Sequence, residues 1–325
     1  MNRLRIGTRG SPLALWQART AAAALTRSGG PSCELVTITT TGDRLTQAVL
    51  SEVGGKSVFV KEIEEALLDE TIDVAVHSAK DLPGQLPPGL SINAVLPRED
   101  PRDALVLPIT LDSTRVSSGD GLAKVLDSSP TIGTGSVRRA AQLAALFPTA
   151  VFQSVRGNVE TRLRKLDEGG FDLLVLASAG LVRLGEGRRI SQRLSFDDCV
   201  PAPGQGIVAI ETRTADTDTR SALAAISDGA TMDAFTAERA LLSALGGDCH
   251  VPIGGVTVAD GDDLTLTAVV ASVDGTRILR EQQRALSRDA ATLGDTVAQA
   301  LLYAGAAEII TAGRTGDGLE PSSGS

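Results

Sequence analysis

The chain has 325 residues and a formal net charge of −9, and this length predicts two or three domains. An acidic chain with only 2% aromatic residues argues against nucleic-acid binding, which relies on positive faces and aromatic stacking. No apolar run reaches about 20 residues, and the first residues lack the hydrophobic region of a signal peptide. We therefore expect a cytoplasmic protein with neither a nucleic-acid nor a membrane partner.

Cysteine and histidine are rare. The three cysteines are widely spaced, only two histidines occur, and no C-x-x-C motif is present. An odd number of cysteines in a reducing compartment does not suit a disulfide framework, and this set of residues does not suit a zinc site. We expect no metal.

Alternating strand and helix patterns in the first quarter of the chain predict a parallel sheet flanked by helices. Ser11 precedes Pro12, an arrangement typical of an N-cap followed by the first helical position. The expected elements are a strand at 4–8, a helix from Pro12 to Arg27, a strand at 34–39, a helix at 58–69 and a strand at 73–77.

A second α/β unit begins after residues 101–108, and a proline- and glycine-rich segment at 200–206 predicts the return crossing. Asp274-Gly275 indicates a hairpin turn. The expected elements are strands at 131–134, 151–155 and 171–176, helices at 137–146 and 159–166, a helix at 233–244, strands at 251–258, 264–273 and 277–282, and a helix at 290–304. The Gly- and Ser-rich tail at 313–325 predicts disorder.

Arginines gather beside glycines between residues 133 and 165 of this acidic chain. Arg138, Arg139 and Arg156 follow predicted strand ends near helix N-termini, where free backbone N–H groups favour anions. Guanidinium groups meet carboxylates or phosphates with two hydrogen bonds. The alternative for Arg138, Arg139, Arg162 and Arg164 is that they are solvated helix residues, and we accept it for Arg164. The pattern favours a pocket for a small ligand with several negative charges.

Two further strand ends carry polar residues. Asp81 follows the strand at 73–77, and among so many cations its carboxylate is expected to stay ionised and to stabilise a positive charge. Lys80 and Asp81 also suit a simple turn pair. Arg9 precedes Ser11 at the first strand-to-helix junction, where Ser11 is explained as an N-cap and Arg9 is not.

Two glycine-bounded segments suggest chemistry. Cys249 lies in a loop between a helix and a strand, so its thiol is a candidate covalent anchor or nucleophile, whereas Cys33 and Cys199 fit small buried side chains. Gly-Gly-Lys-Ser at 54–57 is not a phosphate-binding P-loop, because Leu50 stands where that motif needs glycine. A mobile loop that carries Lys56 over the site remains an alternative.

Seven ordered segments together resemble the hydroxymethylbilane synthase family, also called the porphobilinogen deaminase family. They are residues 5–17, 54–62, 76–83, 133–139, 156–162 and 201–206 and the Cys249 loop. The resemblance implies a transferase of haem biosynthesis that condenses four porphobilinogen molecules head to tail and releases ammonia. It also implies a dipyrromethane cofactor bound to Cys249 through a thioether. Asp81 would hold the pyrrole nitrogens and stabilise the cation formed as ammonia leaves.

The resemblance further implies which residues bind carboxylates or line the cleft. Cofactor-binding residues would be Ser78, Lys80, Asp81, Thr134, Ser136, Arg138, Arg139, Ala177 and Gln205 beside Cys249; substrate-binding residues would be Arg9, Ser11, Lys56, Phe59, Arg156, Arg162 and Arg183. Two positions depart from the family pattern. Asp248 stands where glycine usually precedes the cysteine, and Glu52 stands where some members carry a second loop lysine.

The resemblance implies two α/β lobes similar to periplasmic binding proteins, joined by a hinge, and a smaller C-terminal α+β domain with a three-stranded antiparallel sheet. The expected domains are 1–103 with 205–224, 104–204, and 225–312, followed by the tail at 313–325. The family suggests a monomer. Two alternatives share the two-lobed fold: a solute-binding protein, which would need neither Asp81 nor Cys249, and a regulator's effector-binding domain, which would need a DNA-binding module.

Overall fold

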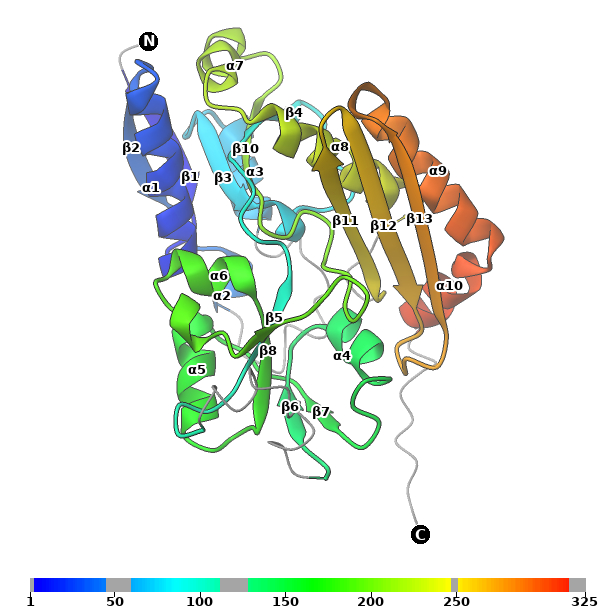
Figure 1. The fold of residues 1–325 in the computed structure, drawn as a ribbon. Coiled ribbons are helices and arrows are strands. Elements are labelled where there is room, and N and C mark those ends of the chain that lie inside the picture. Colours follow the sequence, from blue (N-terminus) through cyan, green and yellow to red (C-terminus); the bar gives the residue numbers. More distant parts are fainter. Residues whose placement is uncertain (1–2, 45–59, 112–127, 247–250, 316–325) are drawn as a thin grey trace.

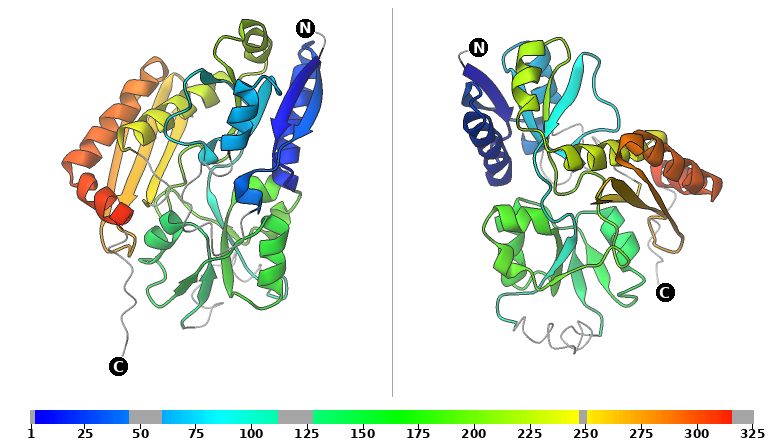
Figure 2. Two further views of the ribbon diagram at one scale, coloured as in Figure 1. Left: turned by 180° about the vertical axis from the view of Figure 1, so that it is seen from behind. Right: turned by 45° about the horizontal axis from the view of Figure 1, so that its top comes forward.

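The computed structural model describes residues 3–44, 60–111, 128–246 and 251–315. Figure 1 shows two α/β lobes, with a third unit of sheet and helices beside them. The two views in Figure 2 show the same three parts from behind and with the top tilted forward. This arrangement confirms the predicted fold class of two lobes and a C-terminal three-stranded sheet. The residue boundaries expected for the three domains stay a prediction.

The first lobe contains a five-stranded sheet in the order β2-β1-β3-β10-β4. Its strands are β1 (Arg3–Thr8), β2 (Ser32–Thr37), β3 (Val74–Ser78), β4 (Leu90–Val95) and β10 (Val208–Arg213). The first three strands run parallel, as predicted. The sequence did not predict β10, which lies antiparallel between β3 and β4. A segment from far along the chain therefore completes this sheet.

Helices cover the first sheet, and α1 begins at the predicted signal. They are α1 (Pro12–Arg27), α2 (Thr41–Arg44), α3 (Lys61–Leu68) and α7 (Thr217–Ala224). The Ser11 hydroxyl accepts a hydrogen bond from the Ala14 N–H at 3.3 Å, which confirms the predicted N-cap of α1. Leu4, Ile6, Leu25 and Val76 pack into one buried cluster between α1 and the sheet.

The second lobe contains a sheet in the order β7-β6-β8-β5-β9, flanked by α4, α5 and α6. Its elements are β5 (Asp103–Val106), β6 (Thr131–Gly133), α4 (Val137–Leu143), β7 (Val151–Gln153), α5 (Val159–Asp167), β8 (Leu173–Ala177), α6 (Ser178–Arg183) and β9 (Gln192–Arg193). Strands β6, β7 and β8 are parallel, but β5 runs antiparallel to β8. Two segments, 96–102 and 200–207, cross between the lobes.

The third unit packs helices against an antiparallel sheet. Its elements are α8 (Gly229–Ala244), β11 (Ile253–Asp260), β12 (Asp263–Ala271), β13 (Ile278–Leu286), α9 (Ala290–Tyr303) and α10 (Ala306–Thr315). Gly275 has a φ of +72° in the turn between β12 and β13, as the Asp-Gly signal predicted. Helix α10 was not expected. It includes residues 313–315, so the prediction that the disordered tail begins at 313 was wrong.

Candidate active site

The carboxyl ends of three strands bring predicted site residues to the junction between the lobes. Strand β3 leads into the 3₁₀ turn η2 (Ala79–Asp81), β6 leads into Thr134, and β8 ends at Ala177. Gln205, on the second crossing segment, connects the lobes. Its Oε1 atom accepts hydrogen bonds from Lys80 Nζ and from Arg139 Nη2, each at 3.4 Å. Lys80 and Arg139 therefore lie on either side of one amide group.

The first turn of α4 carries two adjacent arginines, and both are buried. Ser136 is the N-cap, and its hydroxyl accepts a hydrogen bond from the Arg139 N–H at 3.5 Å. The Thr134 hydroxyl accepts one from the Ser136 N–H at 3.2 Å. Arg138 is 4% exposed and Arg139 is 6% exposed, and both guanidinium groups pair with the buried carboxylate of Asp103. These arginines are therefore not the solvated helix residues of the alternative interpretation.

Asp81 lies among cations from both lobes. Burial lowers the pKa of Arg162 to about 10; the positive charges of Arg139 and Arg156 act in the same direction, and the negative charge of Asp81 opposes them. These four residues therefore share one electrostatic environment. Within the described residues, no group donates a hydrogen bond to the partly exposed Asp81 carboxylate. This carboxylate is available to a ligand.

Lys80 is a second cation of this environment with a lowered pKa. Burial lowers its pKa to about 8; Arg138 and Arg139 lower it further, and Asp81 and Asp103 oppose the shift. Within the described residues, the surroundings of Asp81 hold five cations and two carboxylates, which gives a net charge of +3: Lys80, Arg138, Arg139, Arg156 and Arg162 against Asp81 and Asp103. Such a cluster suits a ligand with several carboxylates.

The sequence analysis missed two buried polar residues of the site. Gln17 on α1 is 2% exposed, and its Nε2 atom donates to the Ser78 hydroxyl at 2.7 Å. Asp103 is fully buried beside Ala177 in the register of β5 and β8. Gln17 interrupts the apolar face of α1, and Asp103 begins an otherwise apolar strand, so a polar residue beside buried apolar ones is the signal that could have identified each.

Three other residues predicted for the site have described partners of their own. Arg9 pairs with Asp43, and Ser11 caps α1. Arg183 donates a hydrogen bond from Nη2 to the Gly206 carbonyl at 2.6 Å. Its guanidinium carbon Cζ lies over the Trp16 ring, 5.3 Å from the ring centroid. Burial lowers the pKa of the Arg183 guanidinium to about 10.

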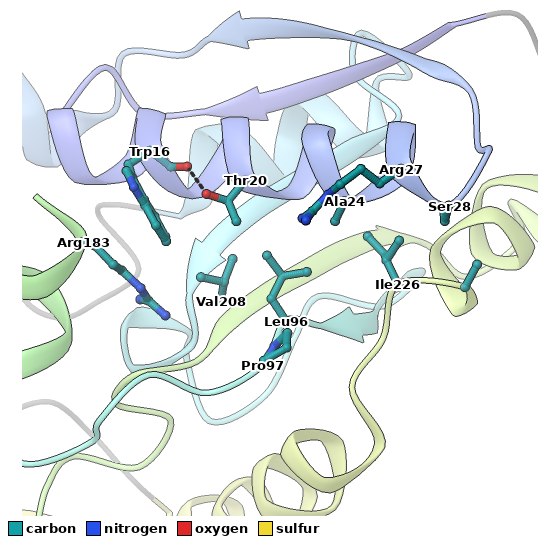
Figure 3. A pocket seen from close by; sticks show the side chains of 11 residues that line it. Trp16, Thr20, Ala24, Arg27, Ser28, Leu96, Pro97, Arg183, Val208 and Ile226 are labelled. Atoms are coloured by element: carbon teal, nitrogen blue, oxygen red, sulfur yellow. Dashed lines mark hydrogen bonds between the residues drawn. The ribbon is translucent and has the colours of Figure 1, made fainter.

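Figure 3 shows Arg183 and Trp16 in a cavity of about 530 Å³ between α1, the first crossing segment, α6 and β10. Leu96, Val208 and Ile226 form much of its apolar lining. Among the described residues that line it, Arg183 is the only one predicted for the site. Asp81 is not among the described residues that line this cavity.

Other predicted residues lie outside the described part of the chain. They are Lys56, Phe59 and Cys249, together with the departures Glu52 and Asp248. Cys33 is partly buried and Cys199 is buried, and both are free thiols. Burial raises the pKa of the Cys199 thiol to about 12, so this thiol stays protonated at neutral pH.

Across the described ranges, no group of three or more His, Cys, Asp or Glu residues could hold a metal ion. No helix in those ranges is long and apolar enough to cross a membrane. Two lobes with a cationic junction define a class of proteins that hold small anionic ligands between domains. In the part of the chain that the structure describes, Asp81 adds to this junction a carboxylate that accepts no protein hydrogen bond.

Comparisons with known proteins identify the family. Residues 4–221 match "Porphobilinogen deaminase, dipyromethane cofactor binding domain", and residues 232–303 match "Porphobilinogen deaminase, C-terminal domain". The porphobilinogen deaminase of Acidithiobacillus ferrooxidans is 46% identical over 94% of this chain and 97% of its own. That of Exiguobacterium sibiricum is 45% identical over 95% and 98%. The chain belongs to the porphobilinogen deaminase family.

This result confirms the predicted family, its class of transferases and the dipyrromethane cofactor domain. A third relative, the porphobilinogen deaminase of Bordetella parapertussis, is 44% identical over 95% of this chain and 96% of its own. Among solved structures, the periplasmic VFT2 domain of BvgS from Bordetella pertussis covers 69% of this chain and 86% of that chain. Its identity is 17% and its TM-score 0.38.

Proposed function

We propose that this protein is a hydroxymethylbilane synthase, which condenses four porphobilinogen molecules head to tail and releases ammonia at each step. The observation that carries the proposal is the Asp81 carboxylate, which has no described hydrogen-bond partner and lies among Lys80, Arg139 and Arg162. Porphobilinogen is a pyrrole with an acetate, a propionate and an aminomethyl group. Its carboxylates match the cations, and its nitrogens match Asp81.

The cations bind and orient the carboxylates of the pyrroles. A charge-assisted hydrogen bond contributes roughly 1.5–3 kcal/mol, so a few such bonds retain an anionic chain over repeated additions. Lys80 and Arg139 approach from opposite lobes and meet at Gln205. Ligand carboxylates between them would hold the two lobes in one relative position, which supports addition of each new unit at the same place.

Asp81 acts on the reacting ring. Its carboxylate accepts hydrogen bonds from pyrrole N–H groups and stabilises the positive charge that develops on the substrate as the bond to the amine breaks. Opposite charges about 4 Å apart at an effective dielectric constant near 20 gain roughly 4 kcal/mol. A preorganised group of this kind accounts for a hundredfold or larger part of a rate enhancement.

The described residues fit a dipyrromethane cofactor with its own carboxylates. Arg138, Arg139, Lys80 and Ser78 would hold it, and Cys249 would provide the thioether. When bound, the dipyrromethane supplies the terminal pyrrole to which the substrate is added. Intact-protein mass spectrometry tests the attachment: the purified protein should carry a two-pyrrole adduct that is absent from Cys249→Ser.

The test of the function follows porphobilinogen consumption and ammonia release by the purified protein. We expect Asp81→Ala to lower turnover at least about a hundredfold. Asp69→Ala, which removes an exposed carboxylate of the same lobe, serves as the control and should keep wild-type turnover. Turnover of Asp81→Ala within about tenfold of wild type would rule out the role assigned to Asp81.

We also infer a cytoplasmic monomer. Membership of the porphobilinogen deaminase family supports this inference. Light scattering coupled to size-exclusion chromatography tests the oligomeric state, and a mass near twice 33.5 kDa would contradict it.

A further inference from the structure

Asp103 is a fully buried carboxylate at the start of β5, the first strand after the chain crosses into the second lobe. Both of its oxygens are occupied. Oδ1 accepts hydrogen bonds from Arg139 Nε at 3.0 Å and from Gln205 Nε2 at 2.8 Å. Oδ2 lies 2.8 Å from Arg138 Nη2 and accepts a weak hydrogen bond from the Cys199 thiol at 3.4 Å. Asp103 therefore has no oxygen free for a ligand.

The carboxylate makes it possible to bury two neighbouring guanidinium groups. Two adjacent buried cations repel each other and lose hydration, and a shared counter-ion offsets both effects. Burial alone would raise the pKa of the Asp103 carboxyl, but Arg138 and Arg139 hold it well below its usual range. Asp103 therefore stays ionised at neutral pH.

Backbone acceptors set the direction of each guanidinium group around this carboxylate. Arg138 donates from Nη1 to the Val200 carbonyl at 2.7 Å, and Arg139 donates from Nη1 to the Val175 carbonyl at 2.9 Å. Gln205 extends the network, because its Nε2 atom bonds Asp103 while its Oε1 atom accepts from Lys80. One carboxylate thus joins α4, β8, the second crossing segment and the first lobe.

We propose that Asp103 is a positioning residue that holds Arg138 and Arg139, and through Gln205 also Lys80, in the arrangement that receives the carboxylates of the pyrrole ligands. It acts without touching the ligand. The inference rests on the proposed function, because the ligand is the one named there. The opposite possibility is that Asp103 competes with ligand carboxylates for the arginines, in which case its removal would strengthen binding.

The test replaces Asp103 by an uncharged residue of the same shape, Asp103→Asn. The matched control is Asp73→Asn, since Asp73 also bridges two arginines, Arg5 and Arg213, but lies at the opposite end of β3 from Asp81. Thermal unfolding of both variants measures the general cost of losing a carboxylate with two arginine partners. A merely structural role would give similar results for the two variants in every other measurement.

The first measurement is the fraction of purified protein that carries the two-pyrrole adduct, read by intact-protein mass spectrometry. We expect this fraction to fall at least about fivefold in Asp103→Asn and to stay near the wild-type level in Asp73→Asn. The second is the KM for porphobilinogen of the loaded protein, which should rise at least about tenfold in Asp103→Asn, as expected for loss of about 1.4 kcal/mol of binding.

The third measurement is the pH dependence of kcat/KM. The negative charge of Asp103 opposes the lowering of the Lys80 pKa, so Asp103→Asn should move the alkaline limb of the profile to lower pH. The charged and polar groups that face Lys80 are Asp81, Arg138, Arg139, Asp103 and Gln205. Among these groups, Asp103→Asn removes the charge of Asp103 alone. Asp73→Asn should leave the alkaline limb of the kcat/KM profile at its wild-type pH.

The outcomes are distinguishable. A wild-type protein without adduct and without porphobilinogen turnover overturns the proposed function itself. The positioning role is overturned if the wild type is active and Asp103→Asn has the adduct fraction and KM of the wild type. A lower KM in Asp103→Asn than in the wild type also overturns it. Should Asp103→Asn fail to fold, Asp103→Glu decides. It keeps the charge but moves the carboxylate by one methylene, and an unchanged adduct fraction and KM would again overturn the proposal.

Discussion

Glu238 offers a sharp test of how the third unit is attached to the two lobes. This residue of α8 is fully buried, and its carboxylate accepts hydrogen bonds from Arg98 Nη1 at 2.6 Å and Nη2 at 3.2 Å. It also accepts the Gly204 N–H at 2.6 Å and the Thr257 N–H at 2.7 Å. Arg98 and Gly204 belong to the two crossing segments, and Thr257 belongs to β11. Four donors thus converge on one charge.

Replacing Glu238 by glutamine preserves the shape but removes the charge and turns one acceptor atom into a donor. At least one of the four donors would then face another donor in the interior. Removing one partner of a buried charge pair costs about 3–5 kcal/mol. We expect the free energy of unfolding of Glu238→Gln to fall by that amount, and the melting temperature to fall by about 10 °C.

The measurement is urea unfolding followed by circular dichroism, with wild type and variant at the same pH. Glu308→Gln is the control, because Glu308 pairs with Arg277 on the surface, where an ion pair contributes at most about 1 kcal/mol. A loss for Glu238→Gln no larger than that of Glu308→Gln would show that water replaces the missing acceptor, and it would refute the reasoning.

Three further outcomes are expected. Burial lowers the pKa of Lys80 to about 8, so its positive charge is lost as the pH rises through that value. We therefore expect kcat/KM for porphobilinogen to fall above about pH 8 and the Lys80→Arg variant to show a smaller fall. An unchanged fall in that variant would exclude Lys80 as its source. Burial raises the pKa of Glu64 to about 7, above its value in the unfolded chain, so ionisation destabilises the fold as the pH rises from about 5 to 8. Denaturant titrations should therefore find Glu64→Gln more stable than wild type by about 1–2 kcal/mol at pH 8, with a difference that shrinks towards pH 4.5; a constant difference would contradict this. Gly206 has a φ of +86°, and a Cβ there would lie 2.3 Å from the Glu99 carbonyl oxygen. Gly206→Ala should therefore lower the free energy of unfolding by at least about 2 kcal/mol. Gly229→Ala is the control and should lower it by nothing, because a Cβ at Gly229 would have open space around it.

Local signals in the sequence determined much of the fold. Ser11 with Pro12 determined where α1 begins, because a side-chain acceptor and a preset φ are properties of those residues alone. Gly275 determined the turn between β12 and β13 in the same way. The parallel strands of each lobe followed from apolar runs that alternate with helical spacing. The grouping of Lys80, Arg139 and Asp81 could also be predicted, since all follow strand ends.

Contacts between distant segments were not predictable from the same signals. Strand β10 pairs with β3 across more than 130 residues, and nothing in its own six residues identifies that partner. Helix α4 ends at Leu143, before the predicted end at Leu146, where the chain turns. The contacts of the Arg183 side chain with Trp16 and the Gly206 carbonyl were not predictable either, since the position of a long side chain depends on its neighbours. That Arg183 binds the substrate stays a prediction.

The sequence by itself determined the family, the caps and turns, and the kinds of side chain that gather at the strand ends. Only the tertiary structure decided that Asp103 lies between two arginines and that Glu238 joins both crossing segments to the third unit. The physical reason is the range of the interactions. A cap or turn satisfies backbone groups a few residues away, whereas a buried charge needs partners that folding brings from any part of the chain.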